Sequence, residues 1–105
     1  MLTETQKDIL HRAIDLAKGY GECEYTMDGK PCCVIGQLAF LTGCSINKMG
    51  EWSGQTVDNE DVPNFIGINK YFLKQIQRIW DGTGERMDPE RARDKMHNMV
   101  DNLGT

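Results

Sequence analysis

The chain has 105 residues, of which 39% are hydrophobic and 27% are charged, and its formal net charge is −4. This length fits one domain, and the composition is that of a globular protein. The acidic balance argues against general nucleic-acid binding, which usually relies on a basic surface. No run of about 18 apolar residues is present, and residues 1–6 lack the apolar region of a secretory signal. We therefore expect a single domain, residues 1–105, with no membrane partner.

The N-terminal segment has the pattern of an amphipathic helix from Thr3 to about Lys18. Its apolar residues follow helical spacing, and charged residues occupy the other face. Thr3 and Gln6 form a capping-box pattern at the start. Gly19 stands where such a helix is expected to end.

A small hairpin is predicted next. Apolar and polar residues alternate over 22–27, which favours a half-buried strand. Asp28-Gly29 suits a type I′ turn, in which both central residues need a positive φ. Pro31 has no N–H to donate, so the returning strand is short or lies at an edge.

Residues 33–41 are apolar on almost every side, which predicts a buried helix. Gly36 inside that helix costs about 1 kcal/mol relative to alanine. We explain the cost by the close approach of another backbone, either the first helix or the hairpin. Ser45 is expected to cap a short helical turn through Lys48.

The cysteines are interpreted as free thiols of the core, because no signal directs the chain to an oxidising compartment. Their spacing has no Cys-x-x-Cys pair, so neither a metal nor a cofactor is predicted. A nucleophilic cysteine is the alternative: Cys33 near a helix start would have a lowered pKa, with His11 or His97 as its base. The four cysteines are Cys23, Cys32, Cys33 and Cys44.

The second half contains an acidic surface loop over residues 51–64, followed by two helices. The first helix is expected from residue 68 or 69 to Trp80. The second starts with Asp88 as N-cap and Pro89 at the first helical position. Trp52 is expected to be exposed within this loop, where an aromatic side chain suits a protein interface.

Two charged groups are candidates for binding. Lys70, Lys74 and Arg78 recur every four residues and form one cationic stripe on a helix, suited to phosphates or an acidic partner. A solvated helix face is the more common meaning of such a stripe. The acidic loop is the second group, with the carboxylates of Asp58, Glu60 and Asp61. Further cations and methionines follow near the C-terminus: Arg86, Met87, Arg91, Arg93, Lys95, Met96 and Met99.

The order of these segments resembles that of a class of small proteins encoded by tailed phages and prophages. That class shares an aromatic-Cys-Cys-Leu-Gly-Val-Leu segment, a later Leu-Asn-Asp turn and a closing helix. Cys32, Cys33 and Gly36 match the first motif, with one additional residue before the glycine. Asp81 matches the aspartate of the turn, and Trp80 stands in place of the asparagine. The likeness covers about residues 19–103 and implies a phage origin.

The predicted fold is mainly α (α+β): a single domain of about four helices with one small β-hairpin. Small size, negative charge and the lack of a catalytic constellation favour a phage accessory protein that binds and inhibits a host defence or regulatory protein in the bacterial cytoplasm. The alternative is a module that sequesters a nucleotide or another phosphorylated signal, and a second alternative is a cysteine-dependent enzyme or metal protein. No catalytic residue and no nucleic-acid partner are predicted, and the oligomeric state stays open. The candidate contact residues are Lys70, Lys74, Arg78, Asp58, Glu60, Asp61 and Trp52.

Overall fold

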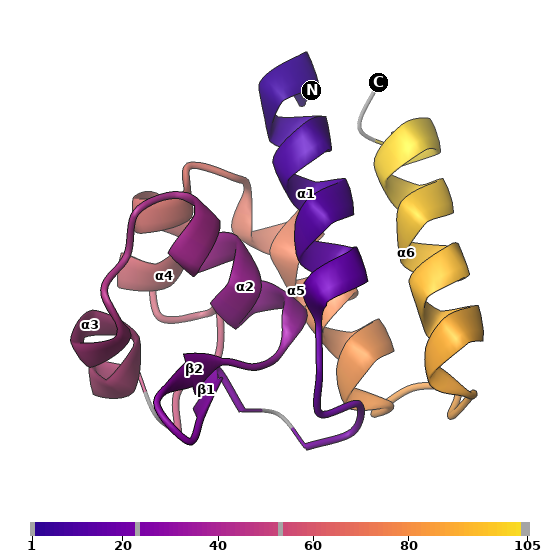
Figure 1. Cartoon of the computed structure of the whole chain (residues 1–105). Coiled ribbons are helices and arrows are strands. Elements are labelled where there is room, and N and C mark those ends of the chain that lie inside the picture. The colour runs from indigo at the N-terminus through magenta and orange to yellow at the C-terminus, as the bar shows by residue number, and fades with distance from the viewer. Residues whose placement is uncertain (1, 23, 53, 104–105) are drawn as a thin grey trace.

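The computed structural model describes residues 2–22, 24–52 and 54–103. This part of the chain contains six helices and one two-stranded antiparallel sheet (Figure 1), which confirms the mainly α class with a small hairpin. Its buried apolar residues form one connected cluster. None of the described helices combines the length and the apolar character that a membrane span would need.

Helix α1 covers Glu4–Leu16 and begins with the predicted capping box. The Gln6 backbone N–H donates to the Thr3 hydroxyl at 3.1 Å, and the Thr3 backbone N–H donates to the Gln6 side-chain oxygen at 2.9 Å. The helix ends before the predicted Lys18. Gly19 has a φ of +68° and lies three residues beyond the helix end, so it turns the chain after the helix and does not cap it.

The end of α1 is completed by side chains from the second half of the chain. The Arg93 guanidinium donates to the carbonyls of Ile14 and Ala17, at 3.3 and 2.7 Å. The Trp80 indole N–H donates to the Lys18 carbonyl at 2.9 Å. Arg93 also lies over the Trp80 ring, 4.9 Å from its centroid. These contacts satisfy carbonyls that a helix end leaves without partners.

The hairpin is shorter than the alternation of residues predicts. Strand β1 (Thr26–Met27) pairs with β2 (Lys30–Pro31), with Met27 opposite Lys30. Asp28 and Gly29 have φ values of 54° and 73°, which confirms the type I′ turn. The half-buried strand over 22–27 is wrong in its extent, because Met27 is 41% exposed and only two residues pair.

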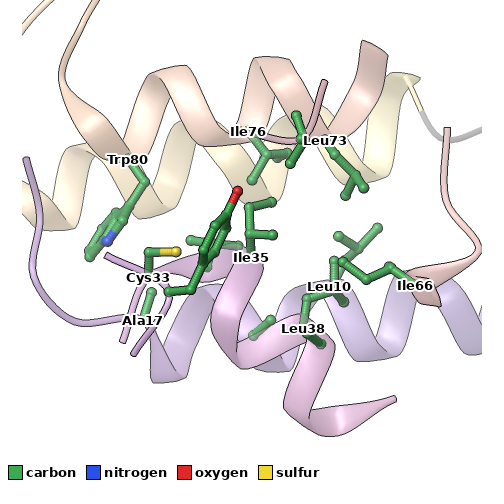
Figure 2. Packing of buried hydrophobic residues seen from close by; sticks show 14 of the residues in the cluster. Leu10, Ala17, Cys33, Ile35, Leu38, Ile66, Leu73, Ile76 and Trp80 are labelled. Atoms are coloured by element: carbon green, nitrogen blue, oxygen red, sulfur yellow. The ribbon is translucent and has the colours of Figure 1, made fainter. Parts of the chain in front are cut away.

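Helix α2 (Val34–Leu41) lies at the centre of the molecule (Figure 1), and its first six residues are all buried. A side chain at Gly36 would overlap the backbone carbonyl of Tyr25, so the predicted close approach is confirmed, and the hairpin arm makes it. Cys33 is the N-cap, and its sulfur accepts the Gly36 N–H at 3.4 Å. The buried α2 residues Ile35 and Leu38 point toward neighbouring helices (Figure 2).

Two short helices follow α2. Helix α3 (Ile46–Glu51) starts at the predicted cap Ser45. Helix α4 (Asp61–Ile66) begins inside the segment predicted to be a loose loop, so that prediction is wrong for residues 61–64. The helix forms because Val62 and Ile66 are buried against the core, and α4 packs on α2.

Helices α5 (Lys70–Asp81) and α6 (Pro89–Leu103) complete the fold near their predicted bounds. The Asn69 side chain caps α5, and the Asp88 carboxylate accepts the backbone N–H groups of residues 90 and 91 at the start of α6. Helix α6 runs antiparallel beside α1, so that α1 begins and α6 ends at the same end of the molecule (Figure 1).

Candidate functional site

Two adjoining hollows lie beside the loop that joins α5 to α6: the first is lined by the loop and α6, and the second by the loop, α5 and α6. Their volumes are about 560 and 300 Å³, and they share the side chains of Glu85, Met87, Lys95 and Met99. We treat them as one site, the α5–α6 groove. Its lining residues are Gln75, Arg78, Ile79, Gly84, Glu85, Met87, Arg91, Asp94, Lys95, Asn98, Met99 and Asn102.

The loop at one end of the groove is held in place by Tyr20. Its hydroxyl accepts the backbone N–H of Met87 at 2.9 Å, and its ring packs edge-on against Trp80, with the centroids 5.3 Å apart. The Arg86 guanidinium lies over the Tyr20 ring, with its carbon 5.4 Å from the ring centroid. Gly82 turns the chain out of α5 with a φ of +68°. Tyr20 therefore fixes the α5–α6 loop against the core, and the Met87 side chain of this loop lines the groove.

The groove combines an apolar lining with cations. Ile79, Met87 and Met99 are half-buried and pack against the core cluster. Methionine is flexible and polarizable, so such a surface adapts to the shape of what binds it. Arg91 and Lys95 lie one helical turn apart on α6 and are exposed.

The cations of the groove have no ion-pair partner among the described residues: Arg78, Arg91 and Lys95 belong to none of the pairs within 4.0 Å. Two carboxylates, Glu85 and Asp94, also line the groove, so cationic side chains outnumber acidic ones by three to two. A third hollow, between α1 and α6, has the opposite balance, with three carboxylates and one arginine. The groove is thus the more favourable of these two places for an anionic group.

The predicted cationic stripe does not act as one surface. Lys74 Nζ lies 3.2 Å from an Asp58 carboxylate oxygen, and Lys70 Nζ lies 4.0 Å from Glu60. Only Arg78 reaches the groove. The stripe and the acidic loop, predicted as separate contact surfaces, are therefore brought together and partly neutralise each other.

The other two predicted contact residues lie elsewhere. Asp61 is exposed at the first turn of α4, where its carboxylate lies near the positive end of that helix. Trp52 is only 2% exposed, so its predicted exposure is wrong. Its ring packs edge-on between Tyr25 and Phe65, each 6.1 Å away between centroids. A buried indole of this kind stabilises the core and offers no surface to a partner.

The cysteines of the described chain are core thiols. Cys32, Cys33 and Cys44 are buried and free, as predicted, and Cys23 lies outside the described residues. Burial raises the pKa of the Cys33 thiol to about 12, opposite to the lowered value that a nucleophile at a helix start would need. Within the described ranges, no three His, Cys, Asp or Glu side chains are placed to hold a metal ion.

The sequence did not predict the His11–His97 contact, and it predicted only part of the α5–α6 groove. His11 and His97, 86 residues apart, face each other across the contact of α1 with α6. Arg91 and Lys95 were recognised as cations but not joined with Met87 and Met99. The four-residue spacing of Arg91 and Lys95 predicts that they share one helix face. The packing of α6 on α5, which forms the groove, cannot be predicted from a local sequence pattern.

The chain was compared with protein-family models, curated proteins and solved structures, and nothing in the three comparisons matches it.

Proposed function

We propose that this protein acts by binding: it is a small phage-encoded accessory protein that inhibits a host defence or regulatory protein in the bacterial cytoplasm. We further propose that the α5–α6 groove is its contact site. The observation that carries the proposal is the joint presence there of a methionine-lined surface and three cations without ion-pair partners. The phage origin rests on the resemblance of the segment containing Cys32, Cys33 and Gly36.

The chemistry of the groove defines the partner segment. Apolar side chains would cover Met87 and Met99, as in the grooves that receive amphipathic helices. Carboxylates on the same segment would face Arg91 and Lys95, and charge complementarity would then select the partner and speed its encounter. The acidic loop contributes less than expected, because Lys74 already neutralises Asp58.

The test asks whether the protein protects a phage from bacterial defence systems. The protein is expressed in bacteria that carry individual defence systems, and plaques of a phage that each system blocks are counted. We expect the wild type to restore plaques against a system, and Lys95→Glu to lose that effect together with at least about tenfold in affinity for the system's inhibited component.

The matched control is Lys30→Glu on the hairpin, an exposed lysine without an ion-pair partner in the described structure. It makes the same charge change away from the groove and should keep full protection. Equal loss in both variants would contradict the assignment of the groove. Binding that is unchanged by Lys95→Glu would contradict it as well.

The second candidate function is the sequestration of a nucleotide or another phosphorylated signal. It is favoured by the volumes of about 560 and 300 Å³, which fall in the range of small-molecule sites, and by the unpaired Arg78 and Lys95. Thermal unfolding with a panel of nucleotides tests it. A higher midpoint in the wild type that is lost in Arg78→Gln is expected, and no shift with any of them rejects the idea.

A further inference from the structure

Four side chains form a continuous chain of contacts across the α1–α6 contact. His11 Nδ1 lies 2.6 Å from His97 Nδ1, the ring centroids are 4.8 Å apart and the ring planes differ by 25°, so the two rings meet edge to edge through these nitrogens. The outer nitrogens each meet a carboxylate: His11 Nε2 lies 2.9 Å from Asp101, and His97 Nε2 lies 2.8 Å from Asp15. Each carboxylate comes from the opposite helix, so all three contacts join α1 to α6.

The number of protons on the two rings decides how many of these contacts are hydrogen bonds. Each carboxylate accepts, so each Nε2 must carry a proton. The contact between the two Nδ1 atoms needs one donor and one acceptor, hence one proton in all. Three protons on four ring nitrogens satisfy every contact, and the pair then carries a single positive charge.

With any other number of protons, at least one of the three contacts is not a hydrogen bond. With two protons, both rings are neutral and at least one of the three contacts lacks its hydrogen. With four protons, two N–H groups face each other across 2.6 Å, and two positively charged rings adjoin. The geometry therefore matches one state of the pair.

We propose that the His11–His97 pair is a one-proton site that fastens α1 to α6 through one hydrogen bond shared by the two rings and one from each ring to a carboxylate. The proposal is independent of the function suggested for the α5–α6 groove. It nevertheless has a consequence there, because α6 also carries Arg91 and Lys95 of the groove wall.

Charged side chains lie near the pair on both helices. Along α1 they are Lys7, Asp8, Arg12 and Asp15, and along α6 they are Arg93, Asp94, Lys95 and Asp101. Arg93 is engaged by carbonyls at the end of α1, and Glu90 shares the hollow beside His97. Helix α2 has no charged residue, and the α5 lysines pair with the acidic loop.

The direct test is nuclear magnetic resonance of the full chain with isotope-labelled histidine at pH about 6.5. We expect three protonated ring nitrogens and one bare nitrogen, with a through-bond coupling between the two Nδ1 atoms. Two doubly protonated rings, or two neutral rings without the coupling, would overturn the proposal. This measurement uses the wild type and requires no variant to fold.

A second measurement is a double-mutant cycle with His11→Gln and His97→Gln, followed by urea denaturation at one pH. Each single variant already loses the hydrogen bond that the two rings share, so the double variant should lose less than the sum of the two single losses. Arg12→Gln combined with His97→Gln is the control, because Arg12 is exposed and forms no ion pair within the described residues, so these two losses should add. Additive losses for His11 and His97 would refute the shared contact.

Discussion

Helix α2 and the α5–α6 groove differ in burial and in charge. Helix α2 has no charged residue, and Val34 through Ala39 are buried against its neighbours. The groove is lined mostly by polar and charged side chains, and its apolar members are only half-buried. This contrast indicates that packing around α2 stabilises the fold. The side chains that are exposed to a partner lie on α5, α6 and their loop, which pack against the core.

At neutral pH, the largest effect should come from the closest contact of the α2 region. Gly36→Ala would place a Cβ on the Tyr25 carbonyl, and backbone cannot yield as a side chain does. We expect the free energy of unfolding to fall by about 3 kcal/mol, measured by urea denaturation. Gly50→Ala in α3 is the control, because nothing lies within 4 Å of its added Cβ. That change should stabilise the protein by up to about 1 kcal/mol.

A protein with Gly36→Ala as stable as the wild type would show that the hairpin arm does not press on α2. The contrast between the two regions would then lose its main support.

The next effect concerns the buried thiol that caps α2. The pKa of Cys33 rises from its ordinary value of 9.0 to about 12 because burial disfavours the thiolate. Between these values the unfolded chain has released a proton that the folded chain retains. Its contribution to stability is thus fully present below pH 9.0 and is lost as pH rises toward about 12. The slope should reach about 1.4 kcal/mol per pH unit.

Urea denaturation across this alkaline range checks the slope, and Cys33→Ala should flatten it. Some slope will remain above pH 10.0, because burial also raises the pKa of Tyr25 to about 12. Rapid reaction of the native Cys33 thiol with a disulfide reagent at neutral pH would contradict its buried state.

A smaller effect is expected where the acidic loop meets α5. A double-mutant cycle with Lys74→Ala and Asp58→Ala should give a coupling of about 0.2–1 kcal/mol, because both side chains are about half exposed. The coupling should shrink at high salt, since solvent ions screen exposed charges. A coupling of zero at low salt would mean that the loop does not neutralise the stripe.

The smallest effect on stability should come from the groove itself. Arg91→Glu combined with Lys95→Glu changes exposed charges that form no ion pair within the described chain. We expect the urea midpoint to stay within the error of the wild-type value, although binding is lost. A large drop would show that these cations support the fold, and the division between the two regions would fail.

Much of the fold could be predicted from the sequence because its signals are local. The capping box of Thr3 and Gln6, the Asp28-Gly29 turn and the Asp88-Pro89 start each act within a few residues. Helix α4 was missed because it is only six residues long and contains Pro63. It is held by burial of its apolar residues, which is a tertiary effect.

The site was less predictable, because it depends on which helices lie side by side. The four-residue spacing predicts Arg78 as a binding residue, but it also groups Arg78 with Lys70 and Lys74. These two lysines form ion pairs with the acidic loop, and only Arg78 lines the groove. Trp52 was placed at the surface from the polarity of its neighbours, although its ring packs between two aromatic side chains. In both cases the deciding contacts join residues that are distant in sequence.

The end of α1 has a consequence for how the chain is made. Its last carbonyls accept hydrogen bonds from Arg93 and Trp80, which lie 62 to 79 residues later. During synthesis α1 emerges well before α5 and α6, which carry these donors. We therefore expect the end of α1 to gain its hydrogen-bond partners only after α6 has been synthesised.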